Sequence, residues 1–210
     1  MNYLNGIMDV QENMLKYVVN YVMEKCPLEI EFFDKFVEKG LIEKLTKLVN
    51  STFTRIKHED VITILKEAKV KWEFAPEYGE DIAREHEKYI TEYFNGPVFI
   101  KNWPKDIKAF YMRLNDDGQT VAAMDLLVPG IGEIIGGSQR EERLDLLEAR
   151  IQELGLNPED YWWYLELRKY GGVVHSGYGL GFERIIMYLT GVANIRDVIP
   201  YPRTVGNAEY

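Results

Sequence analysis

Cysteine is almost absent from this chain of 210 residues, in which Cys26 carries the single thiol. One cysteine permits neither an intramolecular disulfide framework nor a cluster of thiolate metal ligands, and we expect Cys26 to be a buried, reduced thiol. Long apolar runs are missing too: no stretch approaches the length of a membrane span, and the opening residues lack the basic start and apolar core of a signal peptide. The sequence therefore predicts a cytoplasmic protein with no membrane partner.

Positive charge is also scarce, because 25 Lys and Arg stand against 34 Asp and Glu, for a net charge of -9. This balance argues against a broad nucleic-acid-binding face, which needs clustered basic side chains. An RNA or DNA partner would have to meet a local patch or a part of the protein outside this chain. No Gly-Lys-Ser or Gly-Lys-Thr is present, so there is no P-loop, and no internal repeat is visible.

The first half of the chain is dominated by helical patterns. Apolar residues at helical spacing predict a long amphipathic helix over residues 9–25, with Asp9 and Glu12 at capping-box spacing. Further helices are expected over residues 28–40, 41–49, 58–68 and 80–94, with a short strand at 53–56. His86 lies in the last of these helices among charged residues, where an isolated histidine is more often solvated than catalytic.

Strand patterns take over from Pro97 onward. They cover residues 98–103, 108–114, 119–128, 132–138 and 176–182, and residues 115–118 form a turn before the third of them. Helices are expected over about residues 141–154 and 158–171, and again after residue 182. Helices and strands are segregated, which predicts an α+β fold with an antiparallel β-sheet flanked by helices.

The most distinctive stretch is GYGLGFER, residues 177–184. Alternate side chains of a strand point to opposite faces, so its glycines leave one face bare while the large residues between them pack the other. The bare positions are Gly177, Gly179 and Gly181, and the packing positions are Tyr178, Leu180 and Phe182. A flat ligand can lie on a bare backbone, and Arg184 begins a helix, where phosphate oxygens bind well. For this stretch alone, glycines that serve only packing or curvature are the alternative.

Two carboxylates, Asp125 and Glu133, lie on neighbouring strand segments, and Gly-Gly-Ser at 136–138 and Arg140 follow them. Paired carboxylates act either as general acid and base, as in glycoside hydrolysis, or as ligands of a hard cation such as Mg²⁺. The bare Gly-Gly-Ser backbone and the two arginines favour the second: a triphosphate whose charge is shared between a metal and guanidinium groups. An ordinary surface salt-bridge group is the alternative. If the last three strands are neighbours in one sheet, these residues gather on one face.

These segments resemble a known family. Residues 177–184 look like motif 3 of class II aminoacyl-tRNA synthetases. Residues 123–141, 161–184 and 195–203 are similar to the bacterial asparaginyl-tRNA synthetases of the aspartyl, asparaginyl and lysyl subclass. The resemblance runs over nearly the whole chain and is most specific from Lys101 onward.

The resemblance implies an asparagine-tRNA ligase, in which asparagine and ATP form asparaginyl-adenylate and the acyl group then passes to tRNA(Asn). It implies catalysis by positioning and charge neutralisation, without a covalent protein intermediate. The implied roles are Mg²⁺ binding for Glu133, Ser138 and Asp125, ATP binding for Gly177, Gly179, Gly181 and Arg184, catalysis for Arg184 and Glu133, and contact with the amino-acid side chain for Arg140. The full-length enzyme is implied to be a homodimer.

The family's anticodon-binding domain and its motifs 1 and 2 have no counterpart in this sequence. We therefore expect residues 1–210 to be the C-terminal part of an incomplete catalytic domain, inactive alone, with a mainly helical part at 1–95 and the sheet at 96–210. One alternative is an asparagine synthetase-like paralogue that passes an aspartate-derived adenylate to ammonia. Another is a non-catalytic, synthetase-derived binding module, although the intact Arg184 and Glu133 argue against it.

Overall fold

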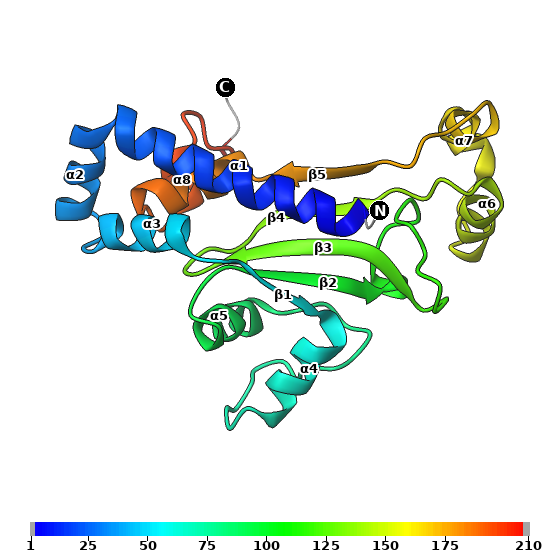
Figure 1. The fold of residues 1–210 in the computed structure, drawn as a ribbon, viewed down its shortest axis with the longest axis horizontal. Helices are drawn as coiled ribbons and strands as arrows, with labels where there is room; N and C mark the ends of the chain where they lie inside the picture. The colour runs from blue at the N-terminus through cyan, green and yellow to red at the C-terminus, as the bar shows by residue number, and fades with distance from the viewer. Residues whose placement is uncertain (1–2, 208–210) are drawn as a thin grey trace.

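The chain folds around one five-stranded sheet, whose strands run across the middle of Figure 1. The structure is a computed structural model that describes residues 3–207. The strands are β1 (Thr54–Lys57), β2 (Val98–Pro104), β3 (Thr120–Val128), β4 (Gly132–Gln139) and β5 (Ser176–Leu180). The helices are α1 (Tyr3–Lys25), α2 (Pro27–Phe36), α3 (Leu41–Asn50), α4 (His58–Glu67), α5 (Arg84–Tyr93), α6 (Leu144–Glu153), α7 (Trp162–Lys169) and α8 (Phe182–Thr190). Single 3₁₀ turns are η1 (Lys105–Ile107), η2 (Pro158–Tyr161) and η3 (Ile195–Val198).

The strands lie in the order in which they occur along the chain, β1-β2-β3-β4-β5. Strands β2 to β5 pair antiparallel, which confirms the α+β fold with helices around an antiparallel sheet. Strand β1 pairs parallel with β2 instead, so this edge of the sheet departs from the antiparallel pattern. Helices α4 and α5 lie between β1 and β2 in the chain and form the crossover connection that a parallel pair requires.

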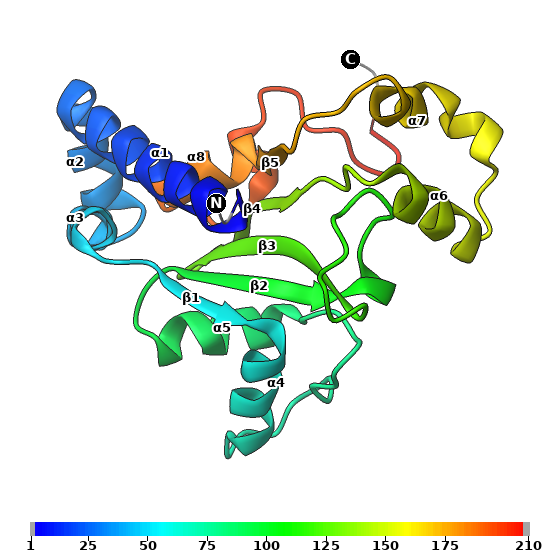
Figure 2. The same ribbon diagram turned by 45° about the vertical axis from the view of Figure 1, so that its right-hand side comes forward.

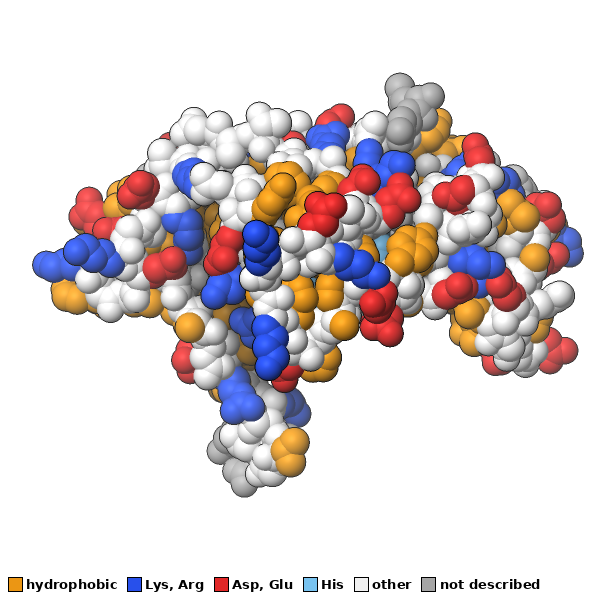
Figure 3. All heavy atoms as spheres, turned by 90° about the horizontal axis from the view of Figure 1, so that it is seen from below, with side chains coloured by type: hydrophobic (Ala, Val, Ile, Leu, Met, Phe, Trp, Pro, Cys, Tyr) orange, Lys and Arg blue, Asp and Glu red, His pale blue; other side chains and the backbone are white. Residues whose placement is uncertain are grey.

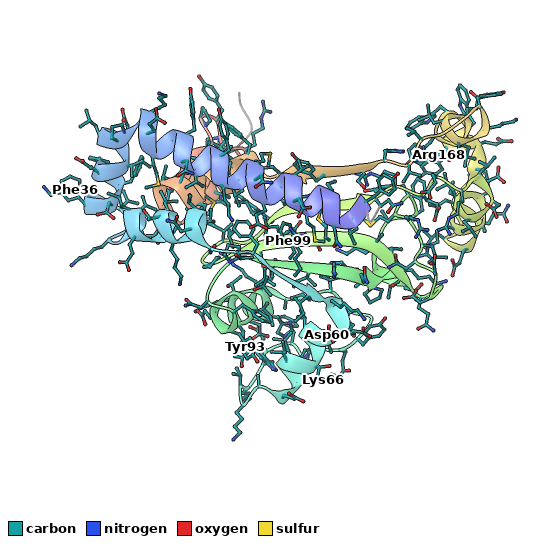
Figure 4. All side chains as sticks on the ribbon, in the orientation of Figure 1. Phe36, Asp60, Lys66, Tyr93, Phe99 and Arg168 are labelled. Carbon is teal, nitrogen blue, oxygen red and sulfur yellow. The ribbon has the colours of Figure 1, made fainter. Side chains whose placement is uncertain are left out.

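Two apolar clusters cover the two faces of the sheet. On one face α1 and α3 pack over the strands through Met8, Leu15 and Leu45, and Phe99 of β2 lies beneath α1 (Figure 4). On the other face Val61 of α4 and further apolar residues pack against β2 and β3. Figure 2 shows α4 and α5 on the side of β1 and β2 that is away from α1. Alternation along the strands sends successive side chains to these two layers. Among residues 3–207, no helix combines the length and apolar content needed to cross a membrane.

Several predicted boundaries differ from the observed ones. Helix α1 begins at Tyr3, so Asp9 and Glu12 lie inside the helix and not at a capping box. Both carboxylates pair with Arg55 of β1, Asp9 at 2.6 Å and Glu12 at 3.4 Å. The stretch after Gln139 stays extended up to Arg143, which places the start of α6 at Leu144 and not near residue 141.

The predicted strand at residues 108–114 is an irregular strap. It makes only isolated bridges, between Met112 and Arg140 and between Leu114 and Val121. The strap passes from the end of β4 to the start of β3, so it cannot follow either strand for a full ladder. The predicted turn after it is confirmed, since the Gly118 amide donates to the Asn115 carbonyl at 3.0 Å.

Three side chains have surroundings that the sequence did not indicate. Cys26 is half-buried and not fully buried. Phe182 is 68% exposed, because β5 ends at Leu180 and Phe182 already belongs to α8. His86 is only 2% exposed, and its ring accepts a hydrogen bond from the Ala83 amide at 3.2 Å. It therefore holds the start of α5 in place, and the expectation of a solvated histidine was wrong.

Candidate functional site

The register of the sheet places the predicted residues side by side. Asp125 of β3 is the partner of Gly136 in β4, and Gly136 is the partner of Gly179 in β5. Ser138 and Gly177 form the next pair but one along the same two strands. Directly paired residues share a face of the sheet. The expectation that these residues meet on one face is therefore confirmed.

The carboxylates of Asp125 and Glu133 converge over the bare Cα of Gly136. A Cβ built on Gly136 would lie 2.8 Å from Glu133 Oε1 and 3.3 Å from Asp125 Oδ1. The pairing of β3 with β4 shifts register between Leu126 and Leu127. At this irregularity Ile134 and Ile135 both enter the core on the α1 side, which turns Glu133 to the opposite face, beside Asp125.

Asp125 is held by Lys108, a residue that the sequence analysis did not single out. Lys108 Nζ lies 2.7 Å from Asp125 Oδ2, and the same ammonium group lies 3.8 Å from the ring centroid of Trp103. Burial raises the pKa of Asp125 to about 6, although the positive charge of Lys108 opposes this shift. Lys108 lies in the strap that was predicted as a strand, so no sequence pattern pointed to its contact with Asp125.

A third carboxylate, Glu87 of α5, reaches the same place. Its Oε2 occupies the space that a Cβ on Gly132 would need. Burial, and next the negative charge of Glu133, raise the pKa of Glu87 to about 7. Sequence reasoning missed Glu87, because it lies in a charged helix 46 positions before Glu133 and only the tertiary fold brings the two together.

Arg184 lies at the other end of the carboxylate group. Its Nη1 donates to the backbone carbonyl of Glu133 and lies 3.6 Å from Glu133 Oε2, and its side chain is 46% exposed. Glu87, Glu133 and Arg184 share the wall of an open depression of about 520 Å³, which η3 and the end of α8 complete. Opposite charges are thus arranged along one open surface.

Only one of the three glycines near Arg184 is bare. A Cβ on Gly179 would meet no heavy atom within 4 Å, whereas one on Gly181 would lie 3.3 Å from Arg184 Cδ. A Cβ on Gly177 would lie 2.9 Å from Arg140 Nη2. The prediction of one uninterrupted bare face was therefore wrong: arginine side chains cover Gly177 and Gly181, and Gly179 is the open position.

Arg140 reaches over the sheet from the end of β4. Its Nη1 donates to Ser138 Oγ at 3.0 Å, and Ser138 is fully buried. No ion pair of Arg140 is formed among residues 3–207. The guanidinium group therefore has donors free for a ligand oxygen.

The residues present fit a small hard cation. Asp125 and Glu133 offer carboxylate oxygens at a backbone position that has no side chain. Burial, the main cause of the raised pKa values of Asp125 and Glu87, disfavours their charged forms, and a bound cation would offset this cost. No cluster of three or more acidic, His or Cys side chains with metal-binding geometry occurs in the described part of the chain. Two protein carboxylates suit Mg²⁺, which commonly completes its shell with water and substrate phosphates.

Beyond the site, charge is mixed. Figure 3 shows acidic and basic side chains interspersed on the face seen from below. On this face the described residues form no broad basic area.

Curated proteins that are similar to this chain share one name. A curated asparagine--tRNA ligase from Clostridium perfringens is 65% identical over 204 residues, covering 97% of this chain and 44% of the relative. The corresponding protein of Clostridium novyi is 63% identical over 208 residues, covering 99% of this chain and 45% of the relative. The chain thus spans less than half the length of these curated relatives.

Solved structures show the same likeness. The crystal structure of asparaginyl-tRNA synthetase from Pyrococcus horikoshii complexed with asparaginyl-adenylate is 40% identical, with a TM-score of 0.87 over 98% of this chain and 45% of that one. The Entamoeba histolytica asparaginyl-tRNA synthetase in complex with asparaginyl-adenylate is 34% identical, with a TM-score of 0.86 over 99% of this chain and 46% of that one. The family model for tRNA synthetases class II (D, K and N) matches residues 1–205, and the chain belongs to this family.

Proposed function

We propose that this chain takes part in the asparagine-tRNA ligase reaction, in which asparagine and ATP form asparaginyl-adenylate and the acyl group is then transferred to tRNA(Asn). The observation that carries the proposal is the 65% identity over 97% of the chain to a curated asparagine--tRNA ligase. The likeness to a synthetase solved with asparaginyl-adenylate supports it.

The site geometry fits ATP. Gly179 leaves open space on β5 in which a flat base can lie against the backbone. Arg184 is half-exposed at the first turn of α8 and can donate to the γ-phosphate. Mg²⁺, when bound, would neutralise phosphate charge, and Glu133 and Asp125 would hold it, with Ser138 nearby.

The remaining arginine fits the amino acid. Arg140 lies on the same face, next to Gly177, and has free donors for a side-chain oxygen. An amide substrate would place its carbonyl oxygen against this guanidinium group. A site built to hydrogen-bond a polar substrate discriminates strongly against analogues that leave its groups unpaired.

The proposal extends to the cellular location, the oligomeric state and the activity of the chain alone. We assign the ligase to the cytoplasm and expect a homodimer, with a mainly helical part at residues 1–95 and the sheet part at 96–210. We expect this chain alone to be inactive. Arg140 is assigned to the amino acid, and Lys108 is already paired with Asp125. This leaves Arg84 and Arg184 beside the depression to meet a triphosphate, so much of the phosphate charge would stay unneutralised.

The test is a calorimetric titration of the purified chain with non-hydrolysable sulfamoyl analogues of asparaginyl-adenylate and aspartyl-adenylate, with and without Mg²⁺. We expect the asparaginyl analogue to bind more tightly. A preference for the aspartyl analogue would favour the asparagine synthetase-like alternative, and binding of neither analogue would contradict the proposal and favour a non-catalytic module.

A further inference from the structure

The guanidinium group of Arg140 lies between an aromatic ring and bare backbone. Its Cζ is 4.8 Å from the ring centroid of Tyr111, and its Nη2 is 2.9 Å from the position of a Cβ on Gly177. Nη1 donates to Ser138 Oγ at 3.0 Å. Ring, backbone and hydroxyl together fix the plane of the guanidinium group while leaving donors unused.

Tyr111 is itself held firmly, although it lies in the irregular strap. The Glu141 amide donates to the Tyr111 carbonyl at 2.9 Å, and the Arg113 amide donates to the Gln139 carbonyl at 3.0 Å. The carboxylate of Glu141 accepts from the Leu114 amide at 2.9 Å. These bonds fasten the strap to the residues on both sides of Arg140, so ring and guanidinium keep a fixed relation.

A second layer supports this attachment. Arg168 of α7, labelled in Figure 4, is 8% exposed and donates through Nε to the Glu141 carbonyl at 3.0 Å. Arg143 Nε donates to Glu141 Oε1 at 2.8 Å, and its Nη2 donates to the Leu114 carbonyl at 2.7 Å. Glu141 thus joins the strap, the end of β4 and α7 around the position of Arg140.

We infer that Tyr111 is a positioning residue for recognition of the amino acid: its ring and the bare Cα of Gly177 hold Arg140 flat, so that the free guanidinium donors meet the side-chain carbonyl of the substrate. The inference rests on the proposed function, since it takes the ligand of Arg140 to be the amino-acid side chain. A guanidinium group stacks well on an aromatic face, and fixing it before binding removes an ordering cost from the binding step.

The first experiment compares Tyr111→Leu with the matched control Tyr111→Phe, which keeps the ring. Each is titrated with sulfamoyl analogues of asparaginyl-adenylate and of alanyl-adenylate, which has no side-chain carbonyl. Tyr111→Leu should weaken the asparaginyl analogue about fivefold, corresponding to about 1 kcal/mol, and leave the alanyl analogue and ATP unchanged. Tyr111→Phe should bind both analogues as the parent chain does. Equal weakening of both analogues by Tyr111→Leu would overturn the inference.

The second variant, Gly177→Ala, approaches Arg140 from the other side. The new methyl group would meet the far end of a flexible side chain, so the guanidinium group would move and the fold would stay intact. We expect an unchanged melting temperature and the same selective loss for the asparaginyl analogue. Full retention of the asparaginyl affinity would contradict the inference.

A measurement without ligand separates this inference from the proposed function. The ¹⁵Nε–¹Hε signal of Arg140, assigned with Arg140→Lys, should be ordered and shifted by the Tyr111 ring, and Tyr111→Leu should abolish the shift. An unshifted signal in the parent chain would overturn the inference whatever the chain binds. An ordered signal with no binding of either analogue would instead overturn the proposed function, and with it the recognition role of Tyr111.

Discussion

Gly136→Ala tests whether the convergence of Asp125 and Glu133 is a cation site. The new Cβ would lie 2.8 Å from Glu133 Oε1, so that oxygen must retreat by about 0.6 Å to reach an ordinary 3.4 Å contact. Glu133 can move, because its side chain is 41% exposed, and alanine tolerates the backbone of this strand. The fold should therefore survive while the carboxylate geometry changes.

The expected loss follows from the strictness of Mg²⁺ coordination. Ligand distances near 2.0–2.1 Å tolerate a deviation of only about 0.2 Å, so a shift of about 0.6 Å breaks the arrangement. Disturbing the support of metal ligands typically costs about 10–100-fold in affinity. We expect Gly136→Ala to weaken cation-dependent ATP binding by about this factor.

The assay is calorimetric titration of ATP at a fixed concentration of Mn²⁺, with Mn²⁺ binding followed separately by electron paramagnetic resonance. Gly172→Ala is the matched control, because its Cβ would make only an ordinary 3.6 Å contact with the Leu167 carbonyl, away from the site. Unchanged Mn²⁺ affinity in correctly folded Gly136→Ala would refute the assignment of a cation to this position.

Three further outcomes are expected. Gly179→Ala adds a methyl group that meets nothing within 4 Å, so it should leave the melting temperature unchanged. If the adenine base lies on Gly179, the same methyl group should weaken ATP binding about tenfold. Unchanged ATP affinity would exclude adenine from this position. Lys108→Met leaves the carboxylate of Asp125 buried without a partner, so it should lower the free energy of unfolding, measured by urea denaturation, by about 3 kcal/mol. The double variant Lys108→Met, Asp125→Leu should recover much of this loss. An unchanged free energy of unfolding in Lys108→Met would contradict the ion pair. Burial lowers the pKa of His58 from 6.5 to about 4. Between these pH values the unfolded chain binds a proton at His58 that the folded chain does not bind. The free energy of unfolding should therefore fall by about 3 kcal/mol as the pH drops from 6.5 to 4, at about 1.36 kcal/mol per pH unit. In His58→Leu this contribution to the pH dependence should vanish, and identical pH profiles for the two chains would show that His58 titrates normally.

Much of the fold could be predicted from local patterns. The helices α2, α3, α4 and α8 and the strands β2 to β5 fall where periodicity and glycine placement indicated them. The family resemblance rested on contiguous motifs such as residues 177–184, and the matching family model confirms it over residues 1–205. These elements can be predicted from the local sequence because the helix period of about 3.6 residues and the strand period of about two residues are both visible within a few neighbouring residues.

The details of the site were less accessible. The strap at residues 108–114 has the apolar and aromatic run of a strand and yet forms only isolated bridges, because its partners at the start of β3 and the end of β4 are set by the tertiary fold. Lys108 and Glu87 were missed for the same reason, since each meets the site from a distant segment. Sequence patterns describe contacts between neighbouring residues, so they do not predict that Glu87 of α5 lies near Glu133 of β4.

The sequence alone determined the α+β class, the glycine positions beside Arg184, and the pair Asp125 and Glu133, because side-chain type and strand alternation are local properties. The tertiary structure alone decided which of these residues meet. The register shift between β3 and β4 turns Glu133 toward Asp125, and two arginines cover Gly177 and Gly181 while Gly179 stays open. Register and side-chain contacts depend on how separate segments pack together, and that information is not contained in any one stretch of the chain.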